Sequence, residues 1–143
     1  MAKSNPGTKT VRIQPTPSGK GYWILGADGG MYPYGDAKWF GSAARAGVSG
    51  AVDFWPTPTG KGYWILTAAG QVLAFGDAVQ KGSMSDLGVR WKAPAVAIVG
   101  TPDGRGYHIL SSDGGVYGFG SAPFFGSLAG SGRSAVALAP AIK

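Results

Sequence analysis

The chain has 143 residues, carries a formal net charge of +6, and contains 26 Gly, 10 Pro, no Cys and one His. The Cys and His counts exclude disulfide frameworks, thiolate nucleophiles and, within one chain, metal sites built from Cys or from several His. The basic charge permits an anionic partner without choosing among nucleic acid, acidic glycan and membrane surface. No stretch reaches the roughly 20 apolar residues of a membrane-spanning helix.

Gly and Pro at this density indicate disorder when they follow no period. The hydrophobic share of 44% and the aromatic share of 12% are instead typical of a folded chain. The placement of the glycines therefore decides between the two interpretations.

The chain begins with a polar segment. Residues 1–9 lack the apolar core of a secretory signal, and we expect them to form a flexible arm. A single all-β repeat domain follows over residues 10–143, with units of about 10–50, 51–94 and 95–143. The missing signal and the missing Cys together predict a protein made in the cytoplasm.

The glycines do repeat. Three segments that begin with Thr-Pro align without a gap, namely Thr16–Ser42, Thr57–Ser83 and Thr101–Ser127. Their shared pattern is T-P-x-G-[KR]-G-Y-[WH]-I-L, then a [DA]-G-[GQ] turn, a short run that ends in G-[DS]-A, and a final G-S. Matches at fixed offsets in three copies are a strong repeat signal.

A second element lies ahead of each Thr-Pro and recurs near the end of the chain. Its four copies are Val11-x-Ile13, Val52-x-Phe54, Val96-x-Ile98 and Val136-x-Leu138. A single closed ring of three units leaves one copy surplus. Because a surplus strand can cover a sheet edge or pair with a neighbouring chain, we expect a homo-oligomer in which strands or sheets cross between chains.

Each unit is expected to form about four short strands. Gly-Tyr-Trp-Ile-Leu is typical of a strand, the Asp-Gly turns supply the positive φ of a tight hairpin, and the return run, such as Val116–Phe119, forms the next strand. A short Phe-Phe-Gly-Ser strand and the Val-x-Ile strand complete the unit. No segment keeps a helical period, so the chain is predicted to be all-β.

Four strands in about 40–45 residues is the size of a β-propeller blade. Because natural propellers have about four to eight blades, we expect the three propeller-blade-like units to be completed by oligomerisation, for example two chains giving six. A threefold β-trefoil or β-prism within one chain is the alternative.

The unit resembles a tandem repeat that is common in actinobacterial cell-surface proteins and in proteins of phages that infect actinobacteria. The matching residues in the first unit are Gly21-Tyr22-Trp23, Asp28-Gly29-Gly30, Gly35-Asp36-Ala37 and Gly41-Ser42. The resemblance covers roughly residues 10–140 and implies a propeller-like, extracellular or virion-associated binding or structural module without a defined catalytic site. The sequence departs from the repeat at Ala69, Gln71, His108 and Ser121.

The titratable residues offer little for catalysis. His108 takes the repeat position of Trp23 and Trp64, and we interpret it as a packing substitute rather than as a catalytic base. The repeated aspartates have structural explanations, as turn residues at Asp28 and Asp113 and as strand-end hydrogen-bond partners at Asp36 and Asp77. The glycine loops lack P-loop spacing and the aspartates lack calcium-loop spacing. We therefore expect no enzyme activity, no cofactor and no metal.

The aromatic residues fall into two groups. The first alternates between the two faces of a strand and is predicted to lie in the core, as Tyr22-Trp23, Tyr63-Trp64 and Tyr107-His108. The second lies near strand ends, as Trp39-Phe40 and Phe124-Phe125, with Val79-Gln80 set against them in the second unit. Exposed rings of the second group would stack on the apolar faces of sugars.

Basic residues recur at one turn of every unit, at Lys20, Lys61 and Arg105. A rotationally repeated fold places them on one rim, where they are either solvated turn residues or a positive ring for an anionic cell-wall polymer or another protein. Nucleic acid is an unlikely partner, because long basic runs and cations interleaved with aromatics are missing.

The sequence predicts a non-enzymatic structural or binding module. The favoured role is a phage virion component, either a minor tail or a head-decoration protein, that acts in assembly or host-surface attachment. Such a protein is released by lysis and locates to the virion or to the host cell surface. The alternative is a lectin-like protein that binds cell-surface glycans by itself.

Overall fold

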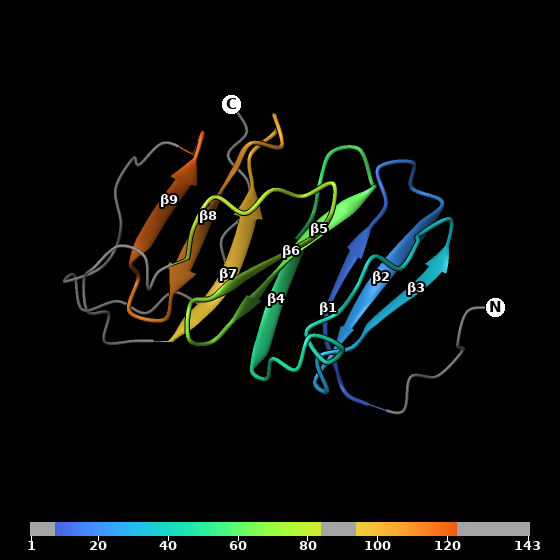
Figure 1. Ribbon diagram of the computed structural model, residues 1–143, viewed down its shortest axis with the longest axis horizontal. Helices are drawn as coiled ribbons and strands as arrows, with labels where there is room; N and C mark the ends of the chain where they lie inside the picture. Colours follow the sequence, from blue (N-terminus) through green and yellow to red (C-terminus); the bar gives the residue numbers. More distant parts are fainter. Residues whose placement is uncertain (1–7, 84–93, 123–143) are drawn as a thin grey trace.

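The computed structural model describes residues 8–83 and 94–122, which form nine strands and no helix. The strands make three antiparallel sheets of three strands each, in which every strand pairs with the next along the chain (Figure 1). The first sheet contains β1 (Thr10–Pro15), β2 (Gly21–Gly26) and β3 (Met31–Gly35). The second contains β4 (Ala51–Pro56), β5 (Gly62–Thr67) and β6 (Val72–Gly76), and the third contains β7 (Ala95–Gly100), β8 (Gly106–Ser111) and β9 (Val116–Gly120). The prediction of an all-β chain is confirmed.

The three sheets are copies of one another down to their irregularities. The Gly-Tyr-Trp-Ile-Leu run and its Gly-Tyr-His-Ile-Leu variant form the central strand, and the Val-x-Ile element forms the strand before it. In each sheet the first pair of strands shifts register near its start, between Thr10 and Arg12 and at the corresponding positions of β4 and β7. Such a repeated bulge re-aims the same side chains in every sheet.

The sheets follow one another face to face, with the second sheet between the first and the third (Figure 1). The strand that opens each sheet lies beside that of the next, because β1 contacts β4 and β4 contacts β7. Each sheet therefore has a leading face, which carries the Tyr of Gly-Tyr and points toward the sheet before it. Its trailing face carries the neighbouring Trp or His.

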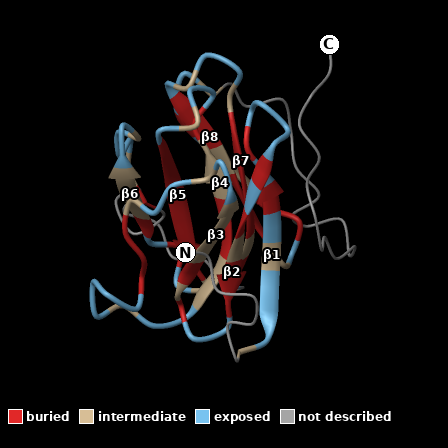
Figure 2. Cartoon of the chain, turned by 90° about the vertical axis from the view of Figure 1, so that its right-hand side faces the viewer, coloured by how far each residue is buried: buried red, intermediate tan, exposed pale blue. Residues whose placement is uncertain are grey.

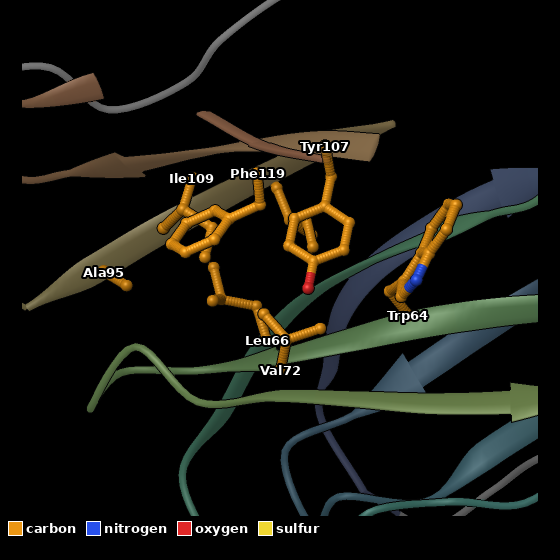
Figure 3. Packing of buried hydrophobic residues seen from close by; sticks show 8 residues of the cluster. Trp64, Leu66, Val72, Ala95, Tyr107, Ile109 and Phe119 are labelled. Atoms are coloured by element: carbon orange, nitrogen blue, oxygen red, sulfur yellow. The ribbon is translucent and has the colours of Figure 1, made fainter. Parts of the chain in front are cut away.

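The core lies between sheets. One cluster joins Trp23, Leu25 and Met31 on the trailing face of the first sheet to Phe54 and Tyr63 on the leading face of the second. The other cluster repeats this contact between the second and third sheets. Figure 3 shows Tyr107, Phe119 and Ile109 of the third sheet pointing toward Leu66 and Val72 of the second.

Polar contacts also connect the opening strands. The carboxylate of Asp53 on β4 accepts a hydrogen bond from the backbone N–H of Ile98 on β7 at 2.8 Å, and its other oxygen lies 2.9 Å from Nε of Arg12 on β1. Burial raises the pKa of Asp53, while the Ile98 amide and Arg12 oppose that rise. Asp53 thus bridges all three sheets.

The prediction of a fourth strand in each unit is wrong where the structure describes the segment. Residues 39–42 form no strand, and the copy at 124–127 lies outside the described residues. The reason is that side chains occupy the backbone groups that a strand would need. The indole N–H of Trp23 donates to the carbonyl of Lys38, and the hydroxyl of Tyr63 binds the N–H of Phe40 and the carbonyl of Gly41.

Candidate functional site

The repeated Thr-Pro turn is fixed by an aspartate from the end of the same sheet. In the first unit, the hydroxyl of Thr16 donates to Asp36 Oδ1 at 2.7 Å and the hydroxyl of Ser18 donates to Asp36 Oδ2. Asp77 accepts the same two hydrogen bonds from Thr57 and Thr59 in the second unit. The carboxylates at these strand ends therefore close turns.

The third unit keeps this network with the two residue types exchanged. Asp103 stands in the turn where the other units have a hydroxyl, and Ser121 stands at the strand end where they have aspartate. The hydroxyl of Ser121 donates to Asp103 Oδ1 at 2.9 Å, and Thr101 donates to the same oxygen at 2.5 Å. The departure from the repeat at Ser121 is thus compensated by Asp103.

The second hairpin turn shows a similar substitution. Asp28 accepts a hydrogen bond from the N–H of Gly30 at 2.8 Å, and Asp113 accepts the equivalent bond from Gly115 at 3.0 Å. The second unit has Ala at this position, and the hydroxyl of Thr67 accepts a hydrogen bond from the N–H of Gln71 instead. These aspartates therefore have backbone partners.

The Thr-Pro turns of successive units touch one another. A Cβ added to Gly60 would lie 2.9 Å from Cδ of Pro17, and a Cβ added to Gly104 would lie 3.0 Å from Cδ of Pro58. Both glycines also have positive φ, so glycine is required there by space and by conformation. A Cβ added to the equivalent Gly19 of the first unit would have no atom within 4 Å.

Lys20, Lys61 and Arg105 are exposed, each in one of these neighbouring turns. They do not form an isolated positive ring, because every turn also holds its aspartate. Hydrogen bonds from Ser18 and Thr16, assisted by Lys20, lower the pKa of Asp36. Hydrogen bonds from Thr101, the Arg105 amide and Ser121 lower the pKa of Asp103 to about 2. The rim of turns thus carries charges of both signs.

Tyrosine hydroxyls hold each sheet to the loop of the unit before it. Tyr63 accepts from the N–H of Phe40 at 2.9 Å and donates to the carbonyl of Gly41 at 2.6 Å. Tyr107 makes the same two bonds with Lys81 and Gly82 of the second unit, at 2.9 and 2.5 Å. Burial raises the pKa of Tyr63 to about 12. We call this pair of hydrogen bonds the tyrosine clamp.

The tyrosine clamp corrects one alignment made from the sequence. Phe40 and Lys81 occupy the same place under successive tyrosines, so Trp39 and Phe40 correspond to Gln80 and Lys81, not to Val79 and Gln80. The indole hydrogen bonds agree, since Trp23 donates to Lys38 and Trp64 donates to Val79.

The residues predicted to stack on sugars differ in how far they are exposed. Trp39 is 49% exposed. Phe40 is half-buried, and its ring lies 5.7 Å from that of Tyr63 in an edge-on contact. Of this pair, Trp39 is therefore the more exposed. Phe124 and Phe125 lie outside the described residues.

The aromatic residues expected in the core differ in burial from one sheet to another. Trp23, Trp64, Tyr63 and Tyr107 have no exposed surface, and His108 is half-buried. Tyr22, at the same repeat position as Tyr63 and Tyr107, is 41% exposed. Its sheet stands at one end of the three described sheets, and no described sheet lies on its leading face (Figure 1).

The first sheet therefore has a partly exposed leading face that the sequence analysis did not single out. It carries the three tyrosines Tyr22, Tyr32 and Tyr34 together with Ile13 and Ile24. Ile13 is 52% exposed, and the rings of Tyr22 and Tyr34 stack with centroids 5.3 Å apart. Figure 2 shows β1 mainly in the colour of exposed residues, whereas β5 is drawn as buried. The available signal was positional, because this sheet is the first of the three in the described part of the chain.

Within the described residues, no three His, Cys, Asp or Glu side chains gather in a way that could hold a metal ion. Among residues 8–83 and 94–122, no helix is long and apolar enough to cross a membrane.

No protein-family model matches the chain, and no curated protein matches its sequence.

Proposed function

We propose that this chain is a non-enzymatic structural and binding module of a phage virion, acting as a minor tail or head-decoration component in assembly or host-surface attachment. The proposal rests on one observation, which is that the repeated polar residues of the chain hold its own turns and sheets together. Asp36, Asp77 and Asp103 fasten turns, while Tyr63 and Tyr107 fasten successive sheets. These repeated groups build a stack of sheets and leave its outer surfaces for contact.

We also propose that the sheets are arranged as propeller blades. Three observations support this arrangement: each sheet is a short antiparallel meander, successive sheets pack face to face, and their opening strands lie side by side. Propeller blades pack in this way around a central channel lined by their inner strands.

Electron microscopy tests the virion role. The sample is phage particles purified from the lysate of a phage whose genome encodes this chain. Gold-labelled antibodies against the chain are expected to decorate the tail or the capsid, and mass spectrometry is expected to find the chain in the particles. Particles that are infective but lack the chain would overturn the proposal. Particles of a deletion mutant, stained in parallel, are the matched control for the antibody.

Glycan binding is the second candidate, and the exposed ring of Trp39 favours it. A single aromatic ring stacked on a sugar gives weak binding, so the test is a glycan array supplemented by binding to intact host cells. Trp39→Ala is expected to abolish retention on a glycan, whereas Val79→Ala, which alters a residue that is 56% exposed, leaves it unchanged. Equal retention of both variants would remove Trp39 from the site.

An anionic cell-wall polymer is the third partner to test, at the rim of turns. Because this rim carries charges of both signs, we expect weak, salt-sensitive binding. A Lys20→Ala/Lys61→Ala/Arg105→Ala variant is expected to lose it. Unchanged binding of the triple variant would exclude the rim.

A further inference from the structure

The leading face of the first sheet exposes apolar side chains at positions that the other two sheets bury. Phe54 and Ile98 take the place of Ile13 in the second and third sheets, and both are fully buried in the clusters between sheets. Ile13 is 52% exposed and Tyr22 is 41% exposed. Because the equivalent residues pack against protein side chains, the internal repeats indicate that this face fits a protein surface.

Among the sheet faces of the described residues, this is the one that a second copy of the chain could also offer. The trailing faces are buried at their centres, where Trp23, Leu66 and Leu110 are at most 2% exposed. The leading faces of the second and third sheets are covered, and their residues Tyr63 and Tyr107 have no exposed surface. A second copy can therefore present the same open face, which gives the self-complementary contact of a two-fold dimer.

The side chains of this face are uncharged, although the whole chain has a net charge of +6. They are Ile13, Ile24, Tyr22, Tyr32 and Tyr34. Arg12 follows the same strand but is directed to the carboxylate of Asp53 in the second sheet, at 2.9 Å. Two basic chains can therefore meet on this face without burying a cation, and tyrosine suits such a contact because it offers apolar area together with a polar end.

The face has an aliphatic half and an aromatic half, which lie one after the other along the strands. Ile13 on β1 pairs with Ile24 on β2, and Tyr22 on β2 pairs with Tyr34 on β3. The rings of Tyr22 and Tyr34 stack with centroids 5.3 Å apart. A two-fold axis that crosses the strands turns their direction around, so it lays the aliphatic half of one copy on the aromatic half of the other.

The exposed charges at the two ends of β2 favour the same direction. Lys20 precedes the strand and Asp28 follows it, and both are exposed. Asp28 lies at the edge of the leading face, because its carboxylate accepts a hydrogen bond from the hydroxyl of Tyr32 at 2.6 Å. Asp36, near Lys20, already accepts two hydroxyl hydrogen bonds within its own turn. With the strands reversed, Lys20 of each copy lies toward Asp28 of the other, and such opposite charges orient an encounter.

We propose that the leading face of the first sheet binds the same face of a second copy of this chain, in a two-fold dimer whose β2 strands run in opposite directions. The strands of this sheet have 5 or 6 residues. Three such strands, about 4.8 Å apart with about 3.3 Å per residue, make a face of only about 15 by 18 Å. This is well below the roughly 800 Å² per partner of a standard interface, so the dimer is weak, with a dissociation constant above about 1 μM.

Sedimentation equilibrium of the full chain, over a concentration series that reaches about 1 mM, is the first test. The mean mass of the wild type is expected to rise from one chain mass toward two. Ile13→Asp and Tyr22→Lys, one in each half of the face, are each expected to raise the dissociation constant at least about tenfold, because each brings a charge into the contact. Urea unfolding of the dilute variants verifies that they fold.

Val79→Asp is the matched control, because Val79 is 56% exposed and follows β6 in the second unit, off the face. It is expected to leave the association unchanged. A wild-type protein that stays at one chain mass throughout the series overturns the proposal. So does an association that Val79→Asp weakens as much as Ile13→Asp does, since the contact would then lie elsewhere.

Cross-linking tests the direction of the contact. The chain has no Cys, so single introduced cysteines report cleanly. A mixture of Lys20→Cys and Asp28→Cys chains is expected to cross-link with a short bis-maleimide. Neither chain is expected to cross-link alone, because the 6 residues of β2 hold its two ends about 20 Å apart. Cross-linking of Lys20→Cys chains to one another, with none in the mixture, would show strands in the same direction and contradict the proposed dimer.

Discussion

The leading faces of the first and second sheets have one sequence pattern and two environments. Tyr63 has no exposed surface, contacts the rings of Trp23 and Phe54, and clamps a loop, whereas Tyr22 is 41% exposed. The difference arises from position, because only the second sheet has a sheet before it. A repeat residue thus gains its structural role from the neighbouring unit rather than from its own strand.

Truncating the two tyrosines should give the largest contrast. Tyr63→Ala removes a buried ring and both clamp bonds, so we expect it to lower the free energy of unfolding by about 3–5 kcal/mol. Tyr22→Ala, measured in dilute protein, should change it by about 0.5 kcal/mol or less, as for other exposed positions. Urea unfolding followed by tryptophan fluorescence provides both values. Equal losses in the two variants would contradict the comparison.

Removing the Asp53 bridge should have an intermediate effect. Asp53→Ala leaves the N–H of Ile98 buried without a partner, which costs about 1–3 kcal/mol. The Nε of Arg12 is also buried and loses its ionic partner, although the side chain as a whole is 40% exposed, so this loss adds to the effect. Asp53→Asn keeps an acceptor for Ile98 and should be closer to wild type. If Asn proves as damaging as Ala, the charge rather than the hydrogen bond connects the sheets.

Removing only the clamp hydroxyls should sharpen the comparison. Tyr63→Phe leaves the N–H of Phe40 and the carbonyl of Gly41 without their partner, and we expect a loss of about 1–2 kcal/mol. Tyr22→Phe should leave the stability of the dilute chain unchanged. Thermal unfolding of both variants beside wild type measures the difference, and a destabilised Tyr22→Phe chain would mean that Tyr22 has a partner within its own molecule.

Acid should weaken the turns at the rim, and we expect this to be the smallest of the effects on stability. Hydrogen bonds lower the pKa of Asp103 from 3.8 to about 2 in the folded chain. A lowered folded pKa stabilises the fold above pH 3.8, and this contribution is lost as the pH falls from there toward about 2. Asp103→Asn should therefore flatten the acid limb of stability against pH, measured by urea unfolding at each pH. A limb as steep as that of wild type would contradict this role for Asp103.

The strands were predictable because each depends on residues within its own unit. Gly-Tyr-Trp-Ile-Leu and the turns around Gly29 and Gly114 carry local signals of strand and hairpin, and both appear in the structure. The expected strand at residues 39–42 failed for the opposite reason. Tyr63 of the next unit takes the backbone groups of Phe40 and Gly41, and Trp23 takes the carbonyl of Lys38 just before them. Such contacts cannot be read from a segment alone.

The candidate site was less predictable than the fold. The recurrence of Lys20, Lys61 and Arg105 can be read from the sequence. The third unit has its aspartate in the turn and its hydroxyl at the strand end, and the contact between Asp103 and Ser121 is seen only when the fold brings these two places together. Tyr22 looked like a core residue because the repeat aligns it with Tyr63 and Tyr107. Its exposure depends on the order of the sheets in space, which a repeat alignment does not contain.

Nitration of tyrosines in dilute protein, mapped by mass spectrometry, tests most directly whether the leading face of the first sheet is exposed while those of the second and third sheets are covered. Nitration proceeds through the phenolate, and Tyr63 is buried with its pKa raised to about 12. We expect Tyr63 and Tyr107 to resist the reagent and Tyr22 to react. Nitration of Tyr22 that is as slow as that of Tyr63 would contradict the difference between the two faces.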